Sequence, residues 1–128
     1  MQNKEIAKPT EAELEILQIL WKQGASTVRS VNEEMNQKRK VGMTTTLKII
    51  QIMTEKGILK RDDSKRPAKF IPLVDEAQTQ SLLIDKLLSS AFGGSAFKMV
   101  MQALGNHKSS EDEMQKIKEL IDQMEKGK

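Results

Sequence analysis

Residues 44–73 decide the fold, and they read TTTLKIIQIMTEKGILKRDDSKRPAKFIPL. The first part repeats apolar residues at the spacing of an amphipathic helix, which we expect to open at Thr44-Thr45-Thr46 and to end near Gly57. The period then changes, which predicts a β-hairpin with Pro72 at a strand end or on a sheet edge. The two strand candidates and the turn-forming charged segment between them are residues 58–61, 69–73 and 62–67.

Two further helices are expected before this stretch. Thr10 and Glu13 have the spacing of a capping box at the start of the first helix, and Gly24 ends it. Ser26 or Thr27 can cap the second helix. Each helix has an apolar stripe on one face, formed by Leu14, Leu17, Leu20 and Trp21 in the first and by Val28, Val31 and Met35 in the second. Three short helices followed by a hairpin is the order of a winged helix-turn-helix domain.

The predicted helix that opens at Thr44 has two different faces. Four residues fall on one side and suit a core, namely Thr46, Ile49, Ile50 and Met53. Thr44, Lys48 and Gln51 fall on the opposite side. Leu47 and Ile52 flank this polar face. They can be ordinary surface residues, contacts to a partner, or contacts to thymine methyl groups.

The polar face of this helix suits DNA. An α-helix fits the major groove, and its N-terminal residues usually face the base edges. Thr44 and Thr45 can bond to phosphates or bases, and Lys48 can reach a guanine edge or a phosphate. The side-chain amide of Gln51 suits adenine. The threonines also suit a plainer role, in which one of them caps the helix.

Positive charge is concentrated in residues 38–74. This stretch has ten basic and three acidic side chains, a net charge of +7, whereas the whole chain has a net charge of only +3. Such a concentration indicates either a surface that binds a polyanion or a solvated basic face. Lys65 and Arg66 lie at the expected tip of the hairpin, where they can contact phosphates or the minor groove.

Residues 75–128 have a different character. Their pattern predicts three amphipathic helices, separated by breaks at Phe92-Gly93-Gly94-Ser95 and at Gly105-Asn106. Ser110 and Glu113 have the capping-box spacing again, at the start of the last helix. Nine acidic and seven basic side chains give this section little attraction for DNA.

The C-terminal section is too short to bury much surface by itself. Its apolar stripes need a partner; the N-terminal domain is one candidate, and a second copy of the same chain is the preferred one. We therefore predict a mostly α fold with a small β-hairpin, with a winged-helix DNA-binding domain at residues 1–74 and a three-helix dimerisation domain at 75–128. The predicted dimer interface consists of Leu83, Leu87, Phe97, Ile117, Leu120, Ile121 and Met124.

Composition excludes several classes of protein. The chain has no cysteine, which excludes disulfides and thiolate metal sites. No apolar run reaches the roughly 18 residues of a membrane span. The segment from Met1 to Lys8 is polar and lacks the apolar stretch of a signal peptide. We expect a cytoplasmic protein with no membrane partner.

An enzyme is not expected. His107 is the only histidine, and no Ser/His/Asp or Cys/His arrangement can be built around it. Glu111, Asp112 and Glu113 lie at a predicted helix N-terminus, where the helix dipole explains them. The sequence has no glycine-rich phosphate loop. We therefore predict no catalytic residue, no metal and no cofactor.

Several segments, in this order and spacing, carry a family resemblance. They are Thr10-Glu11-Ala12-Glu13-Leu14-Glu15-Ile16-Leu17 with Leu20-Trp21, Thr44-Thr45-Thr46-Leu47, Glu55-Lys56-Gly57-Ile58, Lys65-Arg66 with Phe70-Ile71-Pro72, and Phe92-Gly93-Gly94-Ser95. No single segment is specific, but together they resemble the penicillinase repressors of the BlaI/MecI family, with the copper-responsive CopY proteins. The resemblance runs from about Pro9 to Met124.

The resemblance implies a winged-helix domain followed by a three-helix dimerisation domain. It implies a homodimer that binds inverted-repeat operators in double-stranded DNA and represses transcription, often of β-lactam resistance genes or of a related stress response. In the family, the positions that match Thr44, Thr45, Leu47 and Lys48 face the DNA. The position that matches Leu47 is often arginine, so the base preference of this chain can differ.

Two departures from the family concern its signals. Copper-responsive members have a cysteine-rich metal motif near the C-terminus, and this chain has no cysteine. The β-lactam repressors are inactivated by cleavage of an Asn-Phe bond, where this chain has Gln102-Ala103. The cleaved bond of those repressors is therefore not matched here, and the alternatives are a regulatory protease of other specificity or a different signal.

A winged-helix module for protein–protein interaction is the alternative function. Leu47 and Ile52, at the margin of the polar face, are its best support. It predicts weak DNA binding without sequence preference and no operator. The basic hairpin and the basic connector Lys38-Arg39-Lys40 oppose it.

Overall fold

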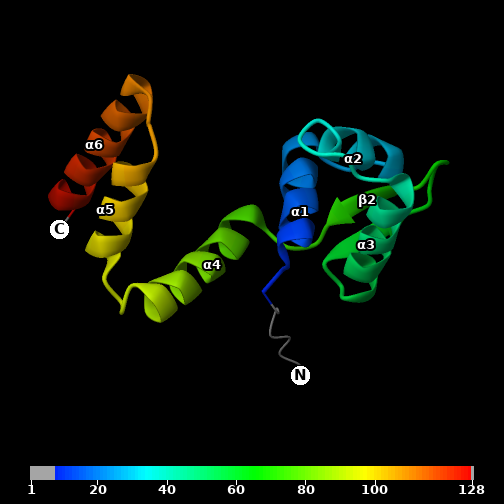
Figure 1. Cartoon of the computed structure of the whole chain (residues 1–128), viewed down its shortest axis with the longest axis horizontal. Helices are drawn as coiled ribbons and strands as arrows, with labels where there is room; N and C mark the ends of the chain where they lie inside the picture. The colour runs from blue at the N-terminus through cyan, green and yellow to red at the C-terminus, as the bar shows by residue number, and fades with distance from the viewer. Residues whose placement is uncertain (1–7, 128) are drawn as a thin grey trace. The chain divides into compact units, whose positions relative to one another are not determined.

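The computed structural model of the chain describes residues 8–127. Its elements follow one another in the order α1 (Glu11–Gln23), α2 (Val28–Met35), α3 (Met43–Glu55), β1 (Leu59–Asp62), β2 (Lys69–Pro72), α4 (Glu76–Ala91), α5 (Ala96–Asn106) and α6 (Glu111–Lys126). This confirms the predicted fold class of three helices and a hairpin followed by three helices (Figure 1). The chain divides into two compact units, one that ends at Leu83 and one that begins at Ile84. The domain boundary expected after residue 74 stays a prediction.

The first two helices begin where local sequence places them. The Thr10 hydroxyl accepts the amide of Glu13, and the Glu13 carboxylate accepts the amide of Thr10, so the predicted capping box is complete. Of the two candidate caps for α2, Thr27 is the one used, because its hydroxyl accepts the amide of Ser30. Gly24 follows α1 with a φ of 85°, a left-handed conformation that glycine adopts without strain.

The predicted start of the third helix needs a correction. Helix α3 begins at Met43, one residue earlier than expected, and its N-cap is Gly42, which provides no side-chain hydrogen bond. The threonines are therefore inside the first turn, and none of them caps the helix. The Thr46 hydroxyl is instead buried and donates to the carbonyl of Gly42.

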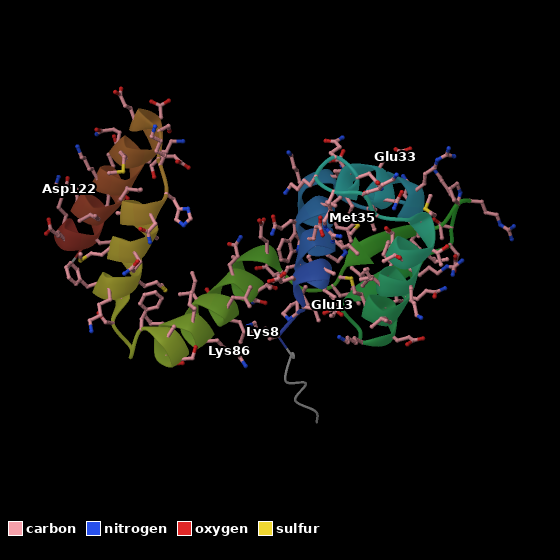
Figure 2. The ribbon with its side chains drawn as sticks, in the orientation of Figure 1. Lys8, Glu13, Glu33, Met35, Lys86 and Asp122 are labelled. Atoms are coloured by element: carbon pink, nitrogen blue, oxygen red, sulfur yellow. The ribbon has the colours of Figure 1, made fainter. Side chains whose placement is uncertain are left out.

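The core of the first unit lies among α1, α2, α3 and the hairpin. Helix α1 packs against α2, α3 and β2, and α3 packs against β1 (Figure 1). On α2, Met35 is buried, whereas Glu33 lies on the exposed side (Figure 2). The buried apolar side chains are Ile16, Leu17, Leu20, Val31, Met35, Val41, Ile50, Met53, Ile58, Leu59 and Phe70.

The hairpin is antiparallel and has an extra partner that local pattern did not reveal. Arg61 pairs with Phe70, one residue pair inside the end of the ladder. Ser26 forms an isolated bridge to Phe70, with two backbone hydrogen bonds of 3.2 and 2.7 Å between the two residues. Farther along the chain, the Trp21 indole donates to the carbonyl of Val74 at 3.1 Å. These contacts attach the hairpin to α1 and to the start of α2.

One ion pair joins α1 to the end of α3. The Lys56 ammonium lies 2.8 Å from the Glu13 carboxylate, and the Glu13 side chain is almost wholly buried (Figure 2). Burial raises the pKa of Glu13, but the hydrogen bond and charge of Lys56, together with the hydrogen bonds from Thr10, outweigh burial and hold this pKa below its ordinary value.

Replacing Glu13 by glutamine is expected to lower the free energy of unfolding by about 1 kcal/mol near neutral pH, because half-exposed Lys56 loses its partner while the Thr10 cap can persist. Urea unfolding measures the change. The pKa is depressed in the folded chain, so the contribution of Glu13 is present above the ordinary carboxyl pKa and disappears as the pH falls through the folded value. The difference between wild type and E13Q should therefore shrink in acid. Glu11→Gln, an exposed change in the same turn, is the control and should have little effect.

The second unit is built differently from the first. It contains the end of α4, with α5 and α6, and neither α5 nor α6 has a buried residue among those described. The element pairs that pack extensively within residues 8–127 all belong to the first unit. Helix α5 continues through Gly105 to Asn106, beyond its predicted end, and Ser110 caps α6 by accepting the amide of Glu113. The apolar stripes of this unit consequently lie open to solvent.

Candidate nucleic-acid interface

Helix α3 turns one face to the core and the other to solvent. Thr46, Ile50 and Met53 are fully buried, as the helical period predicted. The five residues of α3 predicted to bind DNA are all exposed, namely Thr44, Thr45, Leu47, Lys48 and Gln51. This exposure makes the predicted reading face accessible along the helix.

A network of side-chain amides holds α3 against α2. The Asn32 amide donates to the Thr46 hydroxyl at 2.8 Å and to the Val41 carbonyl at 3.0 Å. The side-chain oxygen of Asn36 accepts the Val41 amide, and its side-chain nitrogen donates to the Val41 carbonyl. Both polar groups of the Val41 backbone are thus bound by the end of α2. Because Val41 immediately precedes α3, the network sets the position from which α3 starts.

The loop between β1 and β2 presents two exposed cations. Lys65 and Arg66 are both exposed, in the loop that extends away from the three helices (Figure 1). The loop is shaped from within, since the Asp62 carboxylate accepts the amide of Ser64 at 2.9 Å. Hydrogen bonds from Ser64, with smaller effects of neighbouring lysines, hold the pKa of Asp62 below its ordinary value. Arg61 forms an ion pair with Asp63 at 2.7 Å.

The concentrated positive charge of residues 38–74 is divided by the fold. Arg39 pairs with Glu15 on α1 at 2.7 Å, and Lys56 pairs with Glu13. Both cations are directed to α1 and contribute to the fold rather than to the α3 face. Within residues 8–127, no carboxylate forms an ion pair with the predicted DNA-binding cations Lys48, Lys65 and Arg66.

A hollow that sequence reasoning missed lies where three elements meet. Its volume is about 350 Å³. Leu47 of α3 borders it, whereas Thr44, Lys48 and Gln51 do not. The lining residues are Thr27, Val28, Arg29, Leu47, Arg61, Pro67, Ala68 and Phe70. One feature of the sequence pointed to this surface. Arg29 lies near the Thr27 cap, on the side of α2 that faces away from the buried Val31 and Met35.

The predicted dimer-interface residues lie on all three C-terminal helices. Leu83 and Ile117 are half-buried. The other five are exposed, with accessible fractions of 49% for Leu87, 72% for Phe97, 55% for Leu120, 51% for Ile121 and 63% for Met124. Val100, Met101 and Leu104 of α5 are also exposed, although they are not among the residues of the predicted dimer interface. Their spacing on α5 was visible in the sequence and marks the same apolar stripe as Phe97.

Other kinds of site have little basis in the described residues. His107 is exposed, and residues 8–127 contain no cluster of histidine and carboxylate side chains that could hold a metal ion. Across the same residues, no helix combines the length and apolar character needed to cross a membrane. Gln102 and Ala103 lie inside α5, both exposed.

Comparison with known proteins identifies the family. A family model described as penicillinase repressor matches residues 9–123. The chain belongs to the penicillinase repressor family. The family member named penicillinase repressor in Bacillus licheniformis is 22% identical over 120 residues, which cover 94% of each chain. The match confirms the predicted resemblance and makes this penicillinase repressor-family chain a transcriptional regulator.

A solved structure supports the winged-helix fold of this family member. A MarR family protein from Bacillus stearothermophilus aligns with 93% of the chain and 74% of its own length, at a TM-score of 0.55 and 16% identity. At this low sequence identity, the similarity shows a shared fold only.

Proposed function

We propose that this penicillinase repressor-family chain represses transcription by binding inverted-repeat operator DNA as a homodimer. Each protomer would place α3 in the major groove and the β1–β2 loop on the DNA backbone. The observation that carries the proposal is the exposed polar face of α3 next to a cationic loop whose Lys65 and Arg66 have no carboxylate partner within residues 8–127.

The residue types on α3 suit base edges. Lys48 carries a cation for guanine or phosphate, and Gln51 carries an amide that can bond twice to adenine. Thr44 and Thr45 lie in the first turn without capping it, so their hydroxyls are available to phosphates or bases. The amide network of Asn32 and Asn36 supports this role, because a reading helix must start from a defined position.

The homodimer is supported by the open apolar surface of the second unit. Exposed apolar residues gathered on one helix face are typical of an association surface, since burial of apolar area is the main driving force of association. A second copy supplies the same stripes and therefore a self-complementary partner. Two copies related by a two-fold axis would match the two halves of an inverted repeat.

Protein binding by the same surface is the second candidate. Leu47 and Ile52 are 39% and 40% exposed, which is large for apolar residues beside a polar face. This function requires no sequence preference in DNA. Lys65 and Arg66 on the adjacent loop, which no carboxylate of residues 8–127 pairs with, favour DNA instead.

The proposed function is tested by fluorescence anisotropy with the full chain and duplex DNA from the region upstream of its own gene. Binding should be tight, should weaken steeply with salt and should survive an excess of random duplex, at two chains per site. Weak binding that random DNA erases, for this region and for any duplex enriched from a random library, would contradict the proposal.

Lys48→Ala and Arg66→Ala should have different effects in the same assay. Loss of Lys48 should reduce discrimination between operator and random duplex by about 1–3 kcal/mol, because a base contact is removed. Loss of Arg66 should weaken both duplexes alike and reduce the salt slope by about one unit, because a phosphate contact is removed. Lys22→Ala, an exposed change on α1, is the control. Identical effects of the first two variants would argue against separate roles.

A further inference from the structure

The hollow beside Leu47 is lined by apolar side chains and by two arginines. Val28, Pro67 and Phe70 contribute apolar surface from α2 and the hairpin. Arg29 and Arg61 also line it, with side chains that are 81% and 59% exposed, and Arg61 is paired with Asp63 at 2.7 Å. Arg29 has a distant ion-pair partner, Glu33 at 3.7 Å, so its guanidinium is only weakly held.

We propose that Leu47 and this hollow bind the 5-methyl group of an operator thymine, so that the chain selects a T·A pair at one position of each half-site. The inference rests on the proposed operator binding and deepens it by naming the base feature that is read.

The chemistry of Leu47 restricts what it can read. A leucine side chain neither donates nor accepts a hydrogen bond, so the only feature of a base edge that it can contact favourably is an apolar one. The thymine methyl is the one apolar group that a standard base pair presents in the major groove. Leu47 lies in the N-terminal half of α3, the part of a recognition helix that faces base edges.

The surroundings of Leu47 suit the nucleotide that carries the methyl. The hollow, at about 350 Å³, has room for more than one methyl group. Arg29, whose ion pair with Glu33 is weak, can neutralise a phosphate of the same strand, and such a contact positions a protein on the duplex without reading sequence. An apolar lining beside the weakly paired Arg29 therefore suits a thymidine better than a purely polar base edge.

Ile52 offers a matched control on the same helix. It is 40% exposed, against 39% for Leu47, and both are apolar. Ile52 does not border the hollow. An effect that belongs to the hollow should therefore follow Leu47 and not Ile52.

The experiment begins with selection of duplexes from a random library by the full chain. The enriched duplex is then synthesised with deoxyuridine in place of single thymidines, which removes only the methyl group. At the position that Leu47 reads, one deoxyuridine in a single half-site should weaken binding roughly fourfold. Deoxyuridine at that position in both half-sites should weaken binding about fifteenfold. The L47A variant should bind the thymidine and deoxyuridine duplexes alike, whereas I52A should keep the wild-type ratio.

Several results would overturn the inference. Equal affinity of wild type for every deoxyuridine duplex would exclude a methyl contact, while tight operator binding would leave the proposed function intact. A thymidine preference that survives in L47A would place the contact elsewhere. A selection that enriches no duplex would overturn both the methyl site and the operator function. Far-UV circular dichroism of L47A checks that the exposed substitution leaves the fold unchanged.

Discussion

Replacing Leu120 by aspartate is expected to convert the chain to a monomer and to reduce operator affinity by about 100-fold or more. Leu120 is 55% exposed on the apolar stripe of α6, which it shares with Ile121 and Met124. In the proposed dimer this stripe is buried, and an unpaired carboxylate there costs several kcal/mol. A monomer engages one half-site only, and the advantage of linked binding, about 10²–10⁴, is lost.

The oligomeric state is measured by light scattering, and affinity by anisotropy with the selected duplex. Gln115→Asp places the same charge on α6, away from the apolar stripe, and should leave both quantities nearly unchanged. A dimeric L120D variant would show that the interface lies elsewhere in the chain.

The second large effect concerns the spacing of the two half-sites. Inserting five base pairs between them rotates one half-site by about half a turn, so two helices α3 related by a two-fold axis can no longer enter both major grooves. We expect a loss of about 100-fold or more in affinity, since only one half-site is then engaged. The same insertion placed outside the inverted repeat should have no effect. Unchanged affinity after the internal insertion would contradict a two-fold dimer with fixed spacing.

The reading face of α3 could be predicted because it depends on local periodicity. A 3.6-residue period determines which side chains share a face, whatever the rest of the chain does. Thr46, Ile50 and Met53 are buried for this reason, and Thr44, Lys48 and Gln51 are exposed. The capping box of α1 is local in the same sense, since Thr10 and Glu13 are three residues apart.

The hollow beside Leu47 could not be predicted, because its walls come from distant parts of the chain. Arg29 and Pro67 border the same space although they lie 38 positions apart in the sequence. No spacing rule relates them, and only the packing of the hairpin against α1 and α3, with the bridge from Phe70 to Ser26, brings them to one place. The bridge between Ser26 and Phe70 was missed for the same reason.

The positive charge of residues 38–74 was likewise predicted in part from the sequence and in part visible only in the fold. Composition determined that residues 38–74 are strongly basic, but it treated all their cations as equivalent. The fold directs Arg39 and Lys56 to carboxylates of α1, because Glu15 and Glu13 are largely removed from solvent and a nearby cation stabilises their charged form. It leaves Lys48, Lys65 and Arg66 at the proposed DNA surface.

The helices, the hairpin, the polar face of α3 and the apolar stripes of the C-terminal helices could all be predicted from the amino-acid sequence. These features follow from periods, caps and turn residues that act within a few positions. Three features became visible only in the folded chain: Gly42 rather than a threonine caps α3, Arg39 pairs with a carboxylate of α1, and Leu47 borders a hollow. The physical reason is that burial and pairing depend on distance in space, and the fold sets that distance for residues far apart in the chain.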